Sequence, residues 1–270
     1  MAKDDHSAVD RVVDILEYIA AHKSGATFSE IMRELSIPKS SLHPLVHTLC
    51  KRRFLYHKAN EQRYFLGDLI FSLGIEYRNN AGLLSMINDV LAELSQKVGE
   101  TCYFGVLSGN EVFYLLKQQA SSNPIQVTAR PGYRLKAYAS GIGKALLSQF
   151  NKEELLLLYP GKLEPVTKNT IVDVEELYRQ LSEWKPEGFF YEREESSAYV
   201  QCIATPVFYQ QKITAALSIA FPVFTDAQNP EKIQFNKENL VQIRQRIEEL
   251  ILRNRDGWVY GDYSLDLRGR

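Results

Sequence analysis

The sequence lacks several features that would place it in a specialised class of protein. It has only three cysteines, Cys50, Cys102 and Cys202, with no CxxC spacing, which argues against a disulfide framework and a zinc ribbon. No apolar run approaches the roughly 20 residues that span a bilayer, and the N-terminal MAKDDHS has no apolar signal-peptide core. These absences predict a cytoplasmic protein with no membrane partner.

An excess of positive charge is also missing. The net charge is −1 at pH 7, which by itself argues against a simple nucleic-acid-binding protein. The cations are unevenly placed, however, because between Lys39 and Arg63 six basic residues accompany one acidic residue, Glu61. A local basic patch on a neutral chain fits a small DNA-contacting surface joined to a larger body. The alternative is an ordinary solvated basic face.

The apolar periodicity near the N-terminus predicts three helices, the last two joined by the tight break Ser36-Ile37-Pro38. The expected helices are Ala8–Ala21, a short helix that Thr27 or Ser29 caps and that ends near Leu35, and a helix that begins at Ser40 or Ser41. Two short helices after a packing helix are the pattern of a helix-turn-helix.

A β-hairpin is expected directly after the third helix. Phe54–Lys58 and Arg63–Leu66 read as its strands, and Ala59–Gln62 as its turn. Because a hairpin in this place is the wing of a winged helix-turn-helix, the combined pattern is more specific than the helices alone.

The remaining chain predicts a second domain. A helical stripe from Leu69 to Tyr77 is expected to connect residues 1–80 with residues 81–270 and can also supply a dimer contact. Beyond this helix the sequence pattern predicts an α+β fold, with helices flanking a mainly antiparallel sheet. Strands are expected at 102–107, 111–117, 124–129, 189–191, 202–209 and 212–221, and helices at 83–98, 140–150, 152–159, 173–184 and 236–253.

Several segments together resemble the IclR family of transcription regulators. They are SAVDRVVDIL (Ser7–Leu16), SIPKSSLHPLVHTL (Ser36–Leu49), RYFLG (Arg63–Gly67), GETCYFGVLSGNEVFYL (Gly99–Leu115), ASGIGKALL (Ala139–Leu147), CIATPVF (Cys202–Phe208) and AALSIAFP (Ala215–Pro222). The resemblance implies an N-terminal winged helix-turn-helix joined by a linker helix to a GAF-like α/β effector-binding domain. It also implies dimers or tetramers on double-stranded operator DNA and a small, often carboxylate-bearing effector.

The chain departs from the family pattern at three places. Pro44 stands where the family usually has arginine in the recognition helix, which removes a DNA-contacting cation. With Ser40 as N-cap, this proline falls at the edge of the first turn, where proline is tolerated. Tyr199 replaces the usual glycine three residues before the cysteine and is expected to fill or reshape the pocket mouth, and Ser197 replaces an acidic residue.

The candidate DNA contacts lie on the third helix, at its end and on the wing. They are Lys39, Ser40, Ser41, His43, His47, Arg52, Arg53 and Arg63. Hydroxyls and free N–H groups at a helix start suit phosphate oxygens, and the two histidines, one turn apart, are within reach of base edges. The alternative for each histidine is a plain surface side chain. A metal site is not predicted, because HPLVH lacks the glutamate of HExxH and no third ligand is evident.

The candidate effector contacts come from the resemblance. They are Val127, Gly141, Ile142, Glu192, Cys202 and Ser218. Gly141 and Ile142 begin a helix whose N–H groups suit an anion, although such glycines can simply let the helix pack close to the sheet. Ser218 alternates with apolar neighbours and so faces a ligand from the other side of its strand. Cys202 is expected to be a small buried hydrophobe.

Other chemistries are weakly supported. Lys144 lacks the GxxxxG spacing of a phosphate-binding loop, so no cofactor is predicted. Glu192, Glu194 and Glu195 are expected in a solvated turn rather than as a catalytic acid pair. An enzyme with a Cys202 nucleophile would need a nearby base, but all five histidines lie in the first 57 residues. The sequence therefore predicts a ligand-controlled DNA-binding regulator and no enzyme; a signalling module that binds protein is the remaining alternative.

Overall fold

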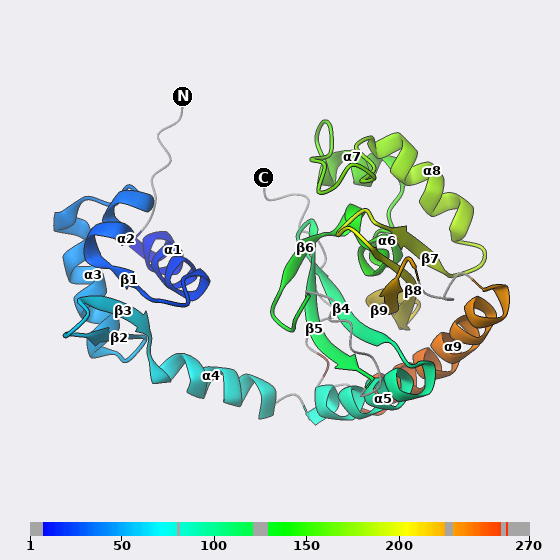
Figure 1. Ribbon diagram of the computed structural model, residues 1–270, viewed down its shortest axis with the longest axis horizontal. Coiled ribbons are helices and arrows are strands. Elements are labelled where there is room, and N and C mark those ends of the chain that lie inside the picture. Colours follow the sequence, from blue (N-terminus) through cyan, green and yellow to red (C-terminus); the bar gives the residue numbers. More distant parts are fainter. Residues whose placement is uncertain (1–7, 80–81, 121–128, 225–228, 255–257, 259–270) are drawn as a thin grey trace. The chain divides into compact units, whose positions relative to one another are not determined.

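The computed structural model describes residues 8–79, 82–120, 129–224, 229–254 and 258. The chain divides into two compact units, Met1–Asn80 and Ala81–Arg270 (Figure 1). None of the helices in the described part combines the length and the apolarity that crossing a bilayer requires.

The first unit is a three-helix core with a small antiparallel sheet. Its elements are α1 (Ala8–Ala21), β1 (Ala26–Thr27), α2 (Phe28–Glu34), α3 (Lys39–Lys51), β2 (Leu55–Lys58) and β3 (Arg63–Leu66), and the strand order is β1-β3-β2. Thr27 begins α2 through a capping box, in which its hydroxyl accepts the Glu30 N–H and the Glu30 carboxylate accepts the Thr27 N–H. Ile15, Ile31 and Leu42 are fully buried where the three helices meet. The expected helices and wing are confirmed.

The start of α3 differs from the expectation. The helix begins at Lys39 with Pro38 in the N-cap position, rather than at Ser40 or Ser41. Pro44 is consequently its sixth residue and lies inside the helix, beyond the first turn. Because proline has no N–H, the intrahelical bond from residue 44 to the Ser40 carbonyl cannot form.

The linker helix α4 (Asp68–Asn79) is attached firmly to the wing. The Gly67 N–H donates to the Phe54 carbonyl at 2.7 Å, and the Leu69 N–H donates to the Arg53 carbonyl at 3.2 Å. A Cβ atom at Gly67 would lie 2.1 Å from that same Arg53 oxygen, so the close approach requires glycine.

The second unit is built on a six-stranded antiparallel sheet in the order β6-β5-β4-β9-β8-β7. Its strands are β4 (Thr101–Ser108), β5 (Glu111–Gln119), β6 (Arg134–Lys136), β7 (Phe190–Arg193), β8 (Val200–Tyr209) and β9 (Lys212–Pro222). Central strands β4, β8 and β9 are buried along most of their length, because helices cover both faces of the sheet.

Two apolar cores lie on opposite faces of this sheet. One face is covered by the adjacent helices α5 (Gly82–Val98) and α9 (Pro230–Arg253), which pack Leu91, Leu94 and Ile247 against the strands (Figure 1). The other face carries the 3₁₀ turn η1 (Ala137–Ala139), α6 (Gly141–Leu147), α7 (Lys152–Leu158) and α8 (Val174–Trp184). Burying each large apolar side chain contributes about 1.5–3 kcal/mol.

Two elements of this unit differ from the sequence expectation. Helix α9 begins at Pro230 rather than at Asn236, because Asn229 caps it and proline suits the first helical position. The short, polar strand β6 carries no alternating pattern and was not predicted. The expected strand at 124–129 falls almost wholly outside the described residues.

Candidate functional site

Helix α3 exposes one polar face in the first unit. Leu42, Val46 and Leu49 point into the core, which turns the intervening residues outward. Lys39, Ser40, His43 and His47 are exposed, and Ser41 is half-buried. The helix thus brings five of the eight expected DNA-contacting residues onto one element.

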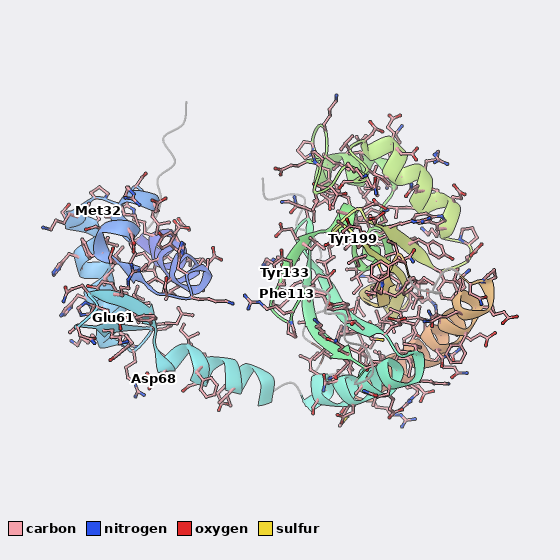
Figure 2. All side chains as sticks on the ribbon, viewed as in Figure 1. Met32, Glu61, Asp68, Phe113, Tyr133 and Tyr199 are labelled. Carbon is pink, nitrogen blue, oxygen red and sulfur yellow. The ribbon has the colours of Figure 1, made fainter. Side chains whose placement is uncertain are left out.

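The three candidate arginines lie in different environments. Arg52 is exposed and forms no ion pair with any residue in the described part of the chain. Arg53 pairs with Asp68, which lies at the start of α4 (Figure 2). The Arg53 Nε atom lies 2.9 Å from the Asp68 Oδ1 atom. Arg63 donates to the Gly25 carbonyl at 2.9 Å and to the Glu30 carboxylate at 3.3 Å. Arg53 therefore links the end of α3 to α4, and Arg63 links the wing strand β3 to α2 and to the turn before it.

The second unit contains a cavity of about 120 Å³ on the α6 side of the sheet. Its lining is rich in hydroxyl groups and consists of Tyr103, Tyr114, Ala129, Tyr133, Leu135, Ser140, Ile142, Glu192, Ser196, Ser197, Val200, Cys202, Ser218 and Ala220. Four of the expected effector contacts, Ile142, Glu192, Cys202 and Ser218, meet here. Val127 lies outside the described residues.

The glycines of α6 have a packing role that needs no ligand. A Cβ atom at Gly141 would lie 2.4 Å from the Cys202 sulfur, and one at Gly143 would lie 2.0 Å from the Ala137 carbonyl oxygen. Ser140 caps the helix by accepting the Gly143 N–H at 3.0 Å. Close packing alone thus requires both glycines, which supports the simpler of the two sequence interpretations.

Cys202 is a buried thiol without an activating partner. Burial raises its pKa well above the usual range, which keeps the sulfur protonated near neutral pH. All five histidines lie in the first 57 residues, so the second unit holds no imidazole that could deprotonate it. The environment is that of a packing and cavity-lining residue.

The acidic segment that begins in β7 and continues into the following turn is not solvated in the way that the sequence suggested. Glu192 and Glu195 are only 3% and 8% exposed. The Glu192 Oε1 atom accepts the N–H groups of Glu195 and Ser196 at 2.6 and 3.0 Å. Burial raises the pKa of Glu192 to about 7. The expectation is wrong because helices and loops far away in sequence cover this turn.

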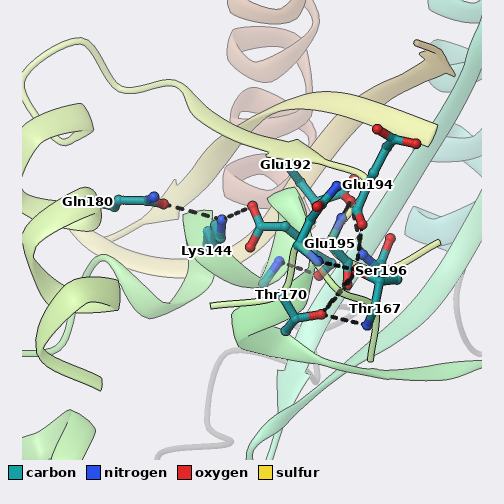
Figure 3. Close-up of polar contacts among 11 residues, drawn as sticks. Lys144, Thr167, Thr170, Gln180, Glu192, Glu194, Glu195 and Ser196 are labelled. Carbon is teal, nitrogen blue, oxygen red and sulfur yellow. Dashed lines mark hydrogen bonds and ion pairs between the residues drawn. The ribbon is translucent and has the colours of Figure 1, made fainter. Parts of the chain in front are cut away.

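Lys144 is the partner that sequence reasoning missed. Its side chain is fully buried, and its ammonium bonds the Glu195 carboxylate and lies 3.4 Å from Gln180 Oε1 (Figure 3). The ammonium also lies 5.3 Å from the centre of the Trp184 ring. The available signal was a lone lysine in the small, apolar helix GIGKALL.

Two threonines hold the same turn in place behind the cavity. The Thr170 hydroxyl donates to the Glu195 carbonyl at 2.7 Å, and the Thr167 hydroxyl donates to the Glu194 carbonyl at 2.6 Å (Figure 3). Tyr199, at the end of the turn, is two-thirds exposed and does not fill the cavity, since it is absent from the lining. Its φ of 64° lies in the left-handed region that favours glycine.

Family comparisons match both units. Residues 8–59 match the IclR helix-turn-helix domain, and residues 75–246 match the C-terminal domain of bacterial IclR transcriptional regulators. The chain is 32% identical over 217 residues to the HTH-type transcriptional regulator BhcR of Paracoccus denitrificans, covering 80% of this chain and 77% of the relative. It is 29% identical to the HTH-type transcriptional repressor AllR of Escherichia coli K12, covering 82% of each chain.

Solved structures share the fold. An IclR regulator from Alicyclobacillus acidocaldarius superposes with a TM-score of 0.78 at 20% identity, over 90% of this chain and 98% of the other. An IclR homologue from Microbacterium hydrocarbonoxydans, in complex with 4-hydroxybenzoate, superposes with a TM-score of 0.76 at 24% identity, over 92% of this chain and all of the other. With a winged helix-turn-helix in one unit, a cavity-bearing α+β domain in the other, and these matches to both, the chain belongs to the IclR family of transcriptional regulators.

Proposed function

We propose that this regulator binds double-stranded operator DNA with Lys39, Ser40, Ser41, His43, His47 and Arg52, and that a small carboxylate in the cavity of the second unit controls this binding. A regulator of operator DNA acts where the DNA is, in the cytoplasm. The observation that carries the proposal is the pairing of an exposed polar recognition helix with a hydroxyl-lined cavity in one chain.

The proposed DNA-contacting residues are those whose polar groups are not engaged within the first unit. Lys39 and Ser40 lie in the first turn of α3, where N–H groups have no intrahelical partner and suit phosphate oxygens. Arg52 has no described intramolecular partner, whereas Arg53 and Arg63 are engaged within the unit. We therefore assign Arg52 to a phosphate contact and the other two arginines to contacts within the first unit.

The size and the lining of the cavity support a small effector. Ser218 and Cys202 project from neighbouring strands into a space of about 120 Å³, which suits a small metabolite rather than a nucleotide. The homologue that holds 4-hydroxybenzoate supports a carboxylate as the ligand class.

Self-association into dimers or tetramers is the third part of the proposal. Large apolar side chains are exposed on α1 and α4, with Val9 70% and Phe71 71% exposed. Apolar surface of this kind is suited to covering by a second copy. Light scattering should give at least twice the monomer mass, and Phe71→Ser should shift the distribution toward monomer.

Arg52→Ala tests the DNA-binding surface. If Arg52 meets a phosphate, the slope of log affinity against log salt for upstream DNA should shrink by about 0.9. Lys162→Ala, which removes an exposed cation from the second unit, is the matched control and should leave the slope unchanged. Absence of any salt-dependent binding by the unaltered protein would contradict the proposal.

Ser218→Ala tests the cavity. Carboxylates that bind should raise the melting temperature of the full chain, since a ligand at a hundred times its Kd adds about 2.7 kcal/mol to the stability of the second unit. Ser218→Ala should reduce this ligand-dependent rise. The control Thr205→Val removes another buried hydroxyl, which donates to the Gly188 carbonyl at 2.9 Å. Thr205 does not line the cavity. This variant should lower stability without altering the ligand-dependent rise.

A further inference from the structure

Among the residues that the structure describes, the lining of the second unit's cavity holds an acid but no base. None of the described residues that line it is a lysine, arginine or histidine, and Glu192 is its one carboxyl group. The buried cation behind it, Lys144, is already matched by the Glu195 carboxylate and by Gln180. An anion that enters the cavity therefore meets no unmatched positive charge among these residues.

The two oxygens of Glu192 have different surroundings. Oε1 accepts two backbone N–H groups (Figure 3), whereas Oε2 accepts no hydrogen bond from any residue in the described part of the chain. In the acid form Oε1 keeps both bonds, and a proton on Oε2 can be donated to a ligand in the cavity. In the ionised form the same atom would present an unpaired negative charge to a buried space, which is unfavourable.

The groups that face Glu192 come from several elements. The backbone N–H groups of Ser196 and Glu195 lower its pKa, the Glu195 carboxylate raises it, and Lys144 of α6 lowers it. Cys202 of β8, Tyr114 of β5 and Tyr103 of β4 stay neutral near pH 7, because burial raises the pKa of each. Burial is the largest influence on the pKa of Glu192 and outweighs the groups that lower it, so it favours the acid form.

We propose that the cavity binds its ligand with Glu192 as the neutral acid, so that a carboxylate enters together with one proton and binds more weakly as the solution becomes alkaline. This inference rests on the proposed effector-binding function and names how the same site recognises its ligand. The protonated carboxyl donates a hydrogen bond to the ligand carboxylate, and hydroxyls such as that of Ser218 supply the rest of the contact.

The direction in which the Kd changes with pH distinguishes binding by neutral Glu192 from binding by ionised Glu192. For a carboxylate that stays ionised, the Kd should rise about tenfold between pH 6 and pH 8, because below the pKa of Glu192 the acid form is already present. A cationic ligand would select ionised Glu192 and bind more tightly at the higher pH.

Isothermal titration of the full chain with acetate, pyruvate and benzoate tests the proposal. At each pH the titration is repeated in buffers of different ionisation enthalpy, which gives the number of protons taken up on binding. We expect about 0.9 proton at pH 8 and about 0.1 at pH 6. Because this measurement uses the unaltered protein, it does not depend on whether a variant folds.

Glu192→Gln is the confirming variant, since an amide donates a hydrogen bond but cannot ionise. Its Kd should match that of the unaltered protein at pH 6 and stay flat to pH 8. Glu248→Gln is the control, because burial also raises the pKa of Glu248 but this carboxyl lies on α9, outside the cavity. Binding without proton uptake would overturn the inference and leave the effector proposal standing. Failure of all three carboxylates to bind at either pH would contradict the carboxylate effector itself, and this inference with it.

Discussion

Replacing Pro44 by alanine should stabilise the first unit, because the proline ring interrupts α3 at its sixth residue. Residue 44 in a regular helix would donate its N–H to the Ser40 carbonyl, and proline also crowds that carbonyl. An interior proline is about 3 kcal/mol less favourable than alanine, and the exposed ring at this position offers little packing in return. We expect the free energy of unfolding of the first unit to rise by about 1–3 kcal/mol. The lower values apply if the first turn of α3 already accommodates the proline ring.

Native-state hydrogen exchange on the full chain measures this gain. The amides of Leu42, Val46 and Leu49, on the buried face of α3, should report the opening free energy of the first unit. Thr48→Ala is the matched control, since Thr48 is exposed on the same helix and its replacement adds only the propensity difference, about 0.5 kcal/mol. If Pro44→Ala gains no more than Thr48→Ala, the proline does not disrupt α3 and the reasoning is refuted.

Three further predictions follow from the side chains described above. Lys144→Met should destabilise the second unit by about 3–5 kcal/mol, because it leaves the Glu195 carboxylate buried without a counter-ion. In urea unfolding, the double variant that also carries Glu195→Gln should recover much of this loss. If the single variant is as stable as the double variant, the prediction is wrong. Arg63→Ala should lower the stability of the first unit by about 1 kcal/mol through its lost bonds to Glu30 and a backbone carbonyl. It should leave the salt slope of DNA binding unchanged, and a reduced slope would instead make Arg63 a phosphate contact. Folding raises the pKa of Glu192 from 4.5 to about 7. Its contribution to the free energy of unfolding is therefore fully present below about pH 4.5 and is lost as pH rises through about 7, a change of about 3 kcal/mol. Melting curves at pH 5 and pH 8 should show this loss, and Glu192→Gln should remove it; equal pH dependence in both proteins would count against it.

The features that the sequence determined by itself are those encoded by neighbouring residues. The apolar spacing over Ala8–Ala21, the threonine and glutamate of the α2 capping box, and the hairpin after α3 are local patterns, and each was found in its expected place. The segments that resemble the IclR family have the same character, since short runs in the right order were sufficient to predict both units and the regulatory function. The start of α3 was missed because Pro38 replaces the serine cap that local rules favour.

Only the tertiary structure decided which charged residues are buried and which are free. Glu195 meets Lys144 across a long separation in sequence, and Arg63 meets Glu30 in the same way, so neither pair has a local signature. Isolated acidic residues in a turn are usually solvated, which is why the segment after β7 was misjudged. The physical reason is that a side chain's solvation depends on what covers it. Here Glu192 and its neighbours are covered by elements that are distant in the sequence, namely α6, α8 and other strands of the sheet. These elements exclude water from the buried groups.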